Sequence, residues 1–214
     1  MTYKIAHLAD VHIKNLKYHY EYRHVFNQLY AILRKNEVDY IYIGGDIAHT
    51  KTQISPEFVQ LCSEFFTNLA EIAPLYIILG NHDGNLRNKS RQNAITPIVN
   101  ALDNSNIHLL ADAGETIVTD DLAFNVLSVF DEDNWVKPSS EDRINIAFYH
   151  GCVAGVSTDA GWIMEYGDHD VSIFAGHDFA MLGDIHKTNQ ILDEDGRVRY
   201  CGSIVQQNHG ETND

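Results

Sequence analysis

The sequence predicts an α/β fold, built as one large domain around a layered core of parallel strands. Two observations predict it: apolar strand-like runs alternate with helical stretches in the first half of the chain, and short strands dominate the second half. The chain has 214 residues, and no internal repeat, low-complexity segment or Pro/Ser-rich linker divides it. We therefore expect residues 1–214 to fold as one unit.

The first half of the chain contains three expected strands separated by two expected helices. The helices are Tyr20–Lys35 and Pro56–Ala73, and the second has Ser55 as its expected N-cap and Pro56 in its first turn. The apolar face of this second helix consists of Phe58, Leu61, Cys62, Phe65, Phe66 and Leu69. The strands are the runs YKIAHLA (3–9), DYIYIGG (39–45) and LYIILG (75–80).

A third helix is expected over Ser90–Leu102, after which the pattern changes to short strands. These runs are rich in β-branched and aromatic residues and are bounded by turn-forming residues. They are NIHLL (106–110), ETIVT (115–119), LAFNVLSVF (122–130), INIAFYH (144–150), VSIFAG (171–176), FAMLGDIH (179–186), QILDE (190–194) and RVRYCGS (197–203).

The composition is that of an ordinary globular protein, with 44% hydrophobic and 21% charged residues. No apolar run approaches the roughly 20 residues that span a bilayer, and the start of the chain lacks the order of a signal peptide. Cys62, Cys152 and Cys201 show no C-x-x-C spacing, so we expect buried thiols in a reducing cytoplasm, which is the host cytoplasm if the protein is viral.

The charge balance limits how the chain can bind nucleic acid. With 30 acidic and 15 basic residues, the formal net charge is −15. This balance argues against a surface that neutralises phosphates uniformly, so any such binding must be local.

Polar side chains follow the apolar strands at five places. In open α/β sheets such groups gather in a crevice beyond the carboxyl ends of the strands. Imidazole, carboxylate and amide donors together suit manganese, iron or zinc, and there are enough of them for two cations. Two adjacent cations can clamp a phosphoryl group and activate water, so the pattern indicates phosphoester hydrolysis. The residues are Asp10, His12, Asp46, His49, Asn81, His82, His150, Asp184 and His186.

The order D-x-H, G-D, G-N-H-D, a later H and G-x-x-H resembles the calcineurin-like metallophosphoesterase superfamily. The segments GDIAH, FAMLGDIHK and YCGSIVQQNHGE are similar to SbcD-type recombination and repair nucleases, which occur in bacteria and phages. The resemblance implies a metallophosphoesterase sandwich of two mixed β-sheets flanked by helices. It also implies exonuclease and endonuclease activity on DNA in double-strand-break repair, dependent on Mn²⁺ or, as a second choice, Mg²⁺.

The same resemblance implies roles for the site residues. Asp10, His12, Asp46 and His186 would hold one cation, and Asp46, Asn81, His150 and Asp184 would hold the other. His82 and His49 would be catalytic groups that face the phosphate. The family usually has a histidine where this chain has Asp184, and the extra carboxylate should favour manganese or magnesium over zinc.

Partners are also implied by the resemblance: DNA, an ABC-type ATPase subunit of the SbcC kind, and a second copy of the chain. The homodimer would form through the helices Pro56–Ala73 and Ser90–Leu102, although aromatic stripes of this kind more often belong to a core. The capping domain and the ATPase-docking region of the family are expected to be absent from residues 1–214.

Two alternatives stay open at this point. The chain could be a phosphatase or phosphodiesterase of the same superfamily that acts on a phosphate ester other than DNA, because the same cations serve all these substrates. Near the site, basic and aromatic residues could contact nucleic acid or could be ordinary loop residues. These are Tyr18, Tyr20 and Tyr22 in one segment and Arg87, Lys89 and Arg91 in the other.

Overall fold

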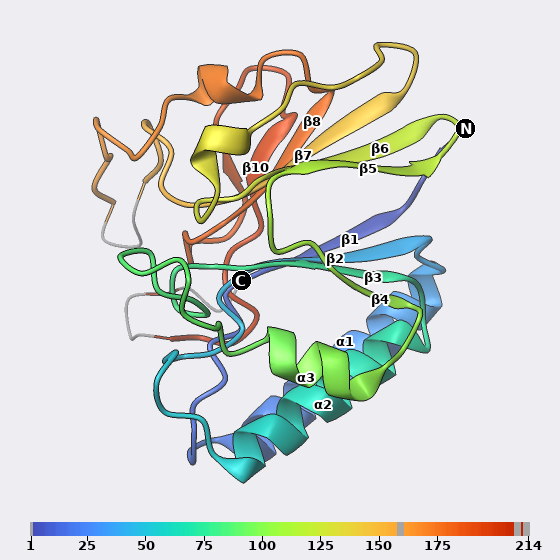
Figure 1. Cartoon of the computed structure of the whole chain (residues 1–214), viewed down its shortest axis with the longest axis vertical. Coiled ribbons are helices and arrows are strands. Elements are labelled where there is room, and N and C mark those ends of the chain that lie inside the picture. Colours follow the sequence, from blue (N-terminus) through green and yellow to red (C-terminus); the bar gives the residue numbers. More distant parts are fainter. Residues whose placement is uncertain (1, 158–160, 208–210, 212–214) are drawn as a thin grey trace.

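The computed structural model describes residues 2–157, 161–207 and 211, and it contains two packed β-sheets with three helices on one side (Figure 1). The expected sandwich of two sheets flanked by helices is confirmed. One sheet is fully parallel and the other is mixed. Residues 208–210 of the YCGSIVQQNHGE segment lie outside the described residues.

The first sheet has four parallel strands in the order β1-β2-β3-β4. They are β1 (Ile5–Leu8), β2 (Tyr40–Gly44), β3 (Leu75–Ile78) and β4 (Ile107–Leu109). The helices α1 (His19–Asn36), α2 (Pro56–Ala70) and α3 (Thr96–Leu102) cover its outer face (Figure 1). No helix in the described part of the chain combines the length and the apolar content that crossing a bilayer requires.

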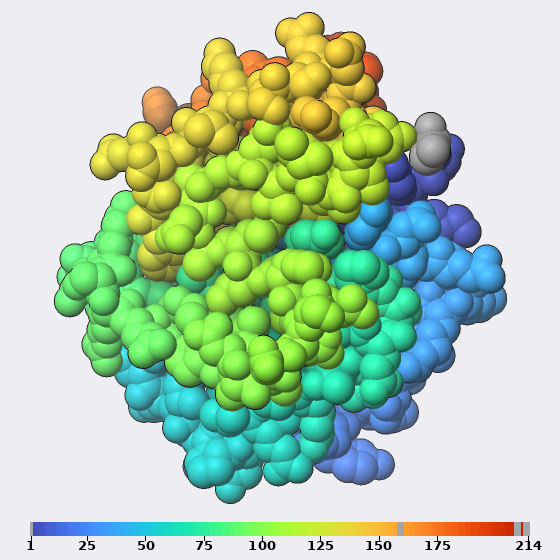
Figure 2. Space-filling view, turned by 45° about the vertical axis from the view of Figure 1, so that its right-hand side comes forward, coloured from blue at the N-terminus to red at the C-terminus, as the bar shows by residue number. Residues whose placement is uncertain are grey.

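The second sheet has six strands in the order β5-β6-β7-β8-β10-β9. They are β5 (Gly114–Thr119), β6 (Leu122–Leu127), β7 (Ile144–His150), β8 (Phe179–Gly183), β9 (Gln190–Ile191) and β10 (Val198–Tyr200). Two short 3-10 helices, η1 (Glu132–Asn134) and η2 (Val171–Phe174), lie in its connections. The chain passes from one sheet to the other between β4 and β5, and this passage is part of the yellow-green band across the middle of Figure 2.

The central strand β2 shows how the layers are held together. Ile41 and Ile43 belong to the core between the first sheet and the helices, whereas Tyr42 belongs to the core between the two sheets. The Tyr42 ring stacks on Phe148 of β7 with 3.7 Å between ring centroids. Because both faces of β2 are buried, its sequence is a continuous apolar run, as is typical of parallel strands inside a sandwich.

Helix α2 confirms its expected start and its role in the core. The Ser55 hydroxyl accepts from the Phe58 N–H over 3.1 Å, and Pro56 occupies the first turn. Phe58, Phe65 and Phe66 are exposed by only 1%, 0% and 0%, so they pack inside the chain and cannot form the surface of a homodimer. The helix ends at Ala70 rather than at Ala73.

Two sequence-based assignments are wrong, and in both a side chain redirects the backbone. The helix expected from Ser90 begins at Thr96, because the Asn93 carboxamide accepts from the N–H groups of Ile95 (3.0 Å) and Thr96 (2.7 Å). The segment 171–176 is a 3-10 turn and not a strand, since the Asp170 carboxylate accepts from the Ser172 N–H over 2.9 Å.

The three cysteines are free thiols. Cys62 and Cys152 are buried, as expected, whereas Cys201 is partly buried. Burial raises the pKa of Cys152 to about 11, which keeps the thiol protonated and unreactive.

Phe65→Ala should destabilise the chain by about 3–5 kcal/mol, because it removes a fully buried ring that stacks on Phe26. The two ring centroids lie 4.0 Å apart. The free energy of unfolding in denaturant measures the effect. Val59→Ala on the same helix is the matched control. Val59 is 37% exposed, so this substitution should change the free energy of unfolding by no more than about 0.5 kcal/mol. Equal losses in the two variants would contradict the placement of this face in the core.

Candidate metal centre

The nine predicted site residues lie at the carboxyl ends of strands from both sheets. Asp10 and His12 follow β1, Asp46 and His49 follow β2, and Asn81 and His82 follow β3. His150 ends β7, and Asp184 and His186 follow β8. The structure brings these five segments together, although they come from opposite sides of the sandwich.

The loops after β1 and β2 continue the parallel hydrogen-bond ladder beyond the strands. The N–H of Asp10 donates to Gly45 over 3.1 Å, and the N–H of His12 donates to the Asp46 carbonyl over 2.9 Å. The pairing of Ile13 with Ile47 at 2.8 Å extends the ladder further. Asp10 and His12 are therefore held at a fixed register against Asp46.

The backbone at four of these residues is strained. Asp10, His12, Asp46 and Asp184 have φ values of 52°, 47°, 53° and 101°. Residues other than glycine rarely adopt such angles, and the strain persists only where the surroundings impose it. Strain of this kind concentrates at functional sites, which agrees with the placement of these side chains at one crevice.

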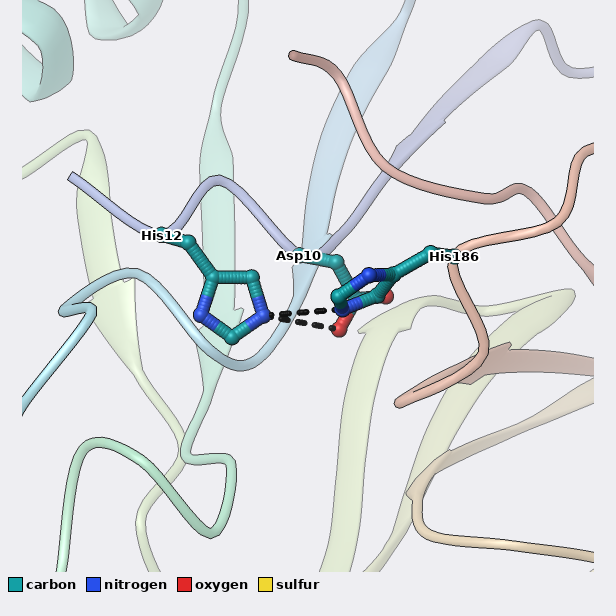
Figure 3. A group of neighbouring side chains, drawn as sticks. All are labelled: Asp10, His12 and His186. Carbon is teal, nitrogen blue, oxygen red and sulfur yellow. Dashed lines mark hydrogen bonds and ion pairs between the residues drawn. The ribbon is translucent and has the colours of Figure 1, made fainter. Parts of the chain in front are cut away.

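One cluster joins Asp10, His12 and His186 (Figure 3). The Nε2 atoms of His12 and His186 lie 3.0 Å apart, and His12 Nε2 is 3.9 Å from Asp10 Oδ1. His12 Nε2 is also 3.5 Å from Asp46 Oδ2. Two imidazole nitrogens and two carboxylates thus point at one small volume, which is the donor set of a cation site.

A second cluster is centred on His150, which is 1% exposed. Its Nδ1–H donates to the Gly44 carbonyl over 2.7 Å, so Nε2 faces the carboxylates of Asp46 at 3.3 Å and Asp184 at 3.6 Å. Glycines make room for the ring: a Cβ at Gly45 or at Gly80 would lie 2.7 Å from its atoms. The glycines that follow these strands therefore have a steric function beside the candidate ligand.

His82 and His49 lie beside the first cluster. The backbone N–H of His82 donates to Asp46 Oδ1 over 2.8 Å, and its ring Nδ1–H donates to the His49 carbonyl over 2.7 Å. The free edge of the exposed His82 ring lies near His12, with 4.9 Å between ring centroids. His82 also falls within ligand distance of His12 and Asp46, so geometry alone permits it either a cation or a substrate role.

The buried charges in the site are strongly coupled. Burial lowers the pKa of His12 to about 3, with His186 and His82 adding to the effect, so its imidazole is neutral at physiological pH. Burial would also lower the pKa of His150, but the carboxylates of Asp46, Asp10 and Asp184 prevail and raise it well above its usual value. Burial likewise raises the pKa of Asp10. The site thus holds protons where cations could bind, and cation binding would release them.

The residues fit a pair of divalent cations. Asn81 Oδ1 is a buried polar atom without a hydrogen-bond partner among the described residues, which is costly unless another group satisfies it. The mixed nitrogen and oxygen donors suit Mn²⁺, Fe²⁺ or Zn²⁺. Asp46 lies between the two clusters, where a bridging ligand would have to be.

Sequence reasoning gave no role to two acidic residues that the structure places at the site. Asp83 is fully buried, and its carboxylate accepts from the N–H groups of Ala48 (2.8 Å) and Gly80 (2.9 Å), tying together the loops after β2 and β3. Burial and the nearby Asp46 raise its pKa to about 7. Glu211 contacts His186. Asp83 ends the quoted GNHD and Glu211 ends YCGSIVQQNHGE, so position in a motif was the signal available for both.

A groove of about 540 Å³ opens beside His49, Asn81 and His82. Lys51 and Arg87 also line it, and we refer to it as the basic groove. The Lys51 ammonium donates to the Asn81 carbonyl over 2.9 Å, which holds this cation next to the site. Arg87, Lys89 and Arg91 are exposed loop residues and not the start of a helix.

The tyrosines after His12 have different positions. Tyr22 is buried at 1% exposure, and its hydroxyl donates to the His12 carbonyl over 2.6 Å, so it supports the loop. Tyr18 and Tyr20 are 56% and 82% exposed, and Tyr18 lines a second groove together with Lys14. The structure therefore excludes Tyr22 from any stacking surface.

Comparison with known proteins identifies related chains. A family model described as calcineurin-like phosphoesterase matches residues 3–181. The uncharacterized protein R555 of Acanthamoeba polyphaga mimivirus is 38% identical over 223 residues, covering 97% of this chain and 16% of that protein. The protein named "Putative phosphoesterase 244L" of Invertebrate iridescent virus 6 is 25% identical over 233 residues, covering 99% of this chain and 73% of that protein.

Among solved structures, a crystal structure of the Pseudomonas putida nuclease MPE aligns with 68% of this chain and 61% of that chain. Its sequence identity is 19% and its TM-score is 0.38. The chain thus spans a small part of the mimivirus protein and most of the iridescent virus protein.

Asp46→Asn should abolish binding of both divalent cations, because the Asp46 carboxylate faces His12 on one side and His150 on the other. Isothermal titration with Mn²⁺ and elemental analysis of the loaded protein measure the stoichiometry. Asp133→Asn, the same change at an exposed position, is the control and should bind as the wild type does. Two cations retained by Asp46→Asn would rule out a bridging position for this residue.

Proposed function

The chain belongs to the calcineurin-like phosphoesterase family, and from this premise we propose that it is a metal-dependent nuclease that hydrolyses phosphodiester bonds in DNA. Membership of the family makes it a metal-dependent phosphoester hydrolase. The finer assignment to DNA rests on what surrounds the site.

The observation that carries the proposal is the basic groove. Its lining includes His49 and His82 together with the cationic side chains of Lys51 and Arg87, so a substrate whose reacting phosphate lies at the histidines would have a channel with two cations beside it. A small phosphate ester would leave this channel unused, whereas a polynucleotide places further phosphates there. The groove also reconciles a polyanionic substrate with a chain of net charge −15, because the positive charge is local.

The residues of the centre would hold two divalent cations, which when bound supply Lewis-acid chemistry for the phosphoryl oxygens and for a water nucleophile. The chain's own contribution is geometric. The ladder between Asp10 and Gly45 and the hydrogen bond from His150 to Gly44 fix the donors before any substrate arrives. Preorganisation of this kind avoids the cost of ordering side chains during the reaction.

His82 is proposed to act on the substrate. Its Nδ1–H donates to the His49 carbonyl, which fixes the ring, and the residue lines the basic groove beside the first cluster. A phosphodiester releases an alkoxide that must be protonated or stabilised, and His82 in its imidazolium form, which carries a proton on Nε2 as well as on Nδ1, can supply that proton. The ring centroids of His49 and His82 lie 6.3 Å apart. At this position His49 can bind an oxygen of the same phosphate.

Mn²⁺ is the proposed cation, with Mg²⁺ as second choice. Asp184 contributes an oxygen donor near His150, at 3.6 Å, where a histidine would contribute nitrogen. Oxygen-rich sites favour harder cations such as Mn²⁺ and Mg²⁺. The remaining imidazole donors favour Mn²⁺ of these two.

The proposed biological setting is SbcD-type recombination and repair, with DNA, an ABC-type ATPase subunit and a second copy of the chain as partners. This part of the proposal rests on the GDIAH and YCGSIVQQNHGE segments. Since the aromatic residues of α2 are core, pairing of two copies would use other residues of α2 and α3. Val59, Pro97 and Leu102 line a groove between these helices and would be available for it.

His82→Asn should lower the single-turnover rate of DNA cleavage by roughly 10²–10⁴-fold while both cations stay bound, because a proton donor is lost and no ligand is removed. Quenched-flow cleavage of linear duplex DNA, together with the Mn²⁺ stoichiometry, measures both effects. Cleavage at the wild-type rate, or the loss of one cation, would show that His82 has a different role.

Lys51→Ala and Arg87→Ala should each weaken DNA binding and lower the salt dependence of binding by about 0.9 in log–log slope, as expected for the loss of one phosphate contact. Lys35→Ala, at an exposed position on α1, is the matched control for loss of charge. Fluorescence anisotropy with duplex DNA at several salt concentrations gives the slopes. Unchanged slopes, combined with good turnover of a chromogenic phosphodiester, would favour the alternative of a non-DNA phosphate ester.

A further inference from the structure

Glu211 lies behind His186, on the side away from the other candidate ligands. We propose that Glu211 is a positioning residue that sets the tautomer and orientation of the His186 ring, so that the ring presents a lone pair to the cation site. The inference rests on the metal centre of the proposed function, but it does not depend on the identity of the substrate.

The two oxygens of the Glu211 carboxylate contact different groups. Its Oε2 atom accepts from the Gln207 N–H over 2.8 Å and from the Ser203 hydroxyl over 2.9 Å. Its Oε1 atom lies 3.0 Å from Nδ1 of His186. The residue is only 7% exposed, so this arrangement is shielded from competing water.

The chemistry of a carboxylate determines which ring nitrogen carries the proton. An ionised carboxylate can only accept, so the hydrogen bond requires a proton on Nδ1 of His186. In the neutral ring, Nε2 then carries the lone pair, and this atom faces His12 Nε2 at 3.0 Å (Figure 3). Two lone pairs this close repel each other unless a proton or a cation lies between them.

The placement of Glu211 also affects ligand strength. A carboxylate that accepts from the far nitrogen of a ligating imidazole fixes the ring and makes the near nitrogen a better donor. His12 has no equivalent support, because its Nδ1 is buried without a hydrogen-bond partner among the described residues. His186 is therefore the oriented imidazole of this pair.

A purely structural role must be separated from this one, because the segment 203–207, which holds the Glu211 carboxylate, also contacts His186 through the backbone. The N–H of Ser203 donates to the His186 carbonyl over 3.0 Å. Loss of the Ser203 hydroxyl would weaken the attachment of the segment and leave the contact between Glu211 and His186 in place. Ser203→Ala is therefore the matched control variant.

The experiment uses the full chain and needs no substrate. ¹⁵N NMR of the histidine rings in the metal-free protein, at about pH 8 so that exposed rings are neutral, reports the tautomer of His186. Isothermal titration with Mn²⁺ reports affinity. We expect Glu211→Leu to lose the Nδ1–H preference and to bind one of the two cations about 10–100-fold more weakly. Glu211→Gln retains an acceptor, so it should keep the tautomer and lose less affinity.

Ser203→Ala should keep both the tautomer and an affinity within about threefold of the wild type. An unchanged tautomer in Glu211→Leu, or wild-type affinity in both Glu211 variants, would overturn the proposal. An equal loss in Ser203→Ala would also overturn it, because anchoring of the segment would then explain the effect. If Glu211→Leu does not fold, Glu211→Gln is the deciding variant: weaker Mn²⁺ binding than in the wild type supports the proposal, and wild-type Mn²⁺ affinity overturns it. If the tautomer and the Mn²⁺ affinities are as expected but the wild-type protein does not cleave DNA, only the nuclease assignment is contradicted.

Discussion

The central constraint of the molecule is the buried carboxylate of Asp46. At 2% exposure it needs polar partners, and the surrounding elements provide them: the imidazoles of His12 and His150 and the backbone N–H of His82 all face it. Burial alone would raise its pKa, yet these partners hold it below its usual range. An isolated ion in such a place would be strongly unfavourable.

The backbone next to this carboxylate is strained where it brings the polar partners into contact with Asp46. Asp10, His12, Asp46 and Asp184 have positive φ angles, and Gly45 and Gly80 leave room for the His150 ring. Such features destabilise a fold slightly and are offset by its core. Here the core is extensive, with β2 buried on both sides and α2 contributing three fully buried phenyl rings. The stability of the sandwich and the geometry of the site thus come from separate sets of residues.

Much of the fold followed from local patterns, since β1 to β3, α1 and α2 have strong periodicity and clear end signals. The two wrong assignments, a helix over 90–95 and a strand over 171–176, have a common cause. The side chains of Asn93 and Asp170 accept hydrogen bonds from nearby backbone N–H groups, and these bonds outweigh the preference that the hydrophobic pattern indicates. The predicted ligands converge because parallel strands end at the same edge. Asp83 and Glu211 could not be assigned roles, because these depend on backbone groups and rings that only the folded chain brings near.

The distance along the chain between the two halves of the site has a consequence during synthesis. His12 and His186 are 174 residues apart in sequence, yet their rings meet in one cluster. While a ribosome is still making β7 and β8, the part of the chain already made carries only the donors that follow β1, β2 and β3. A growing chain therefore cannot complete the centre before β8 and the residues up to His186 are made. Any reactivity of the centre is therefore absent from a nascent chain until the donors at the end of β7 and after β8 have joined those of the first sheet.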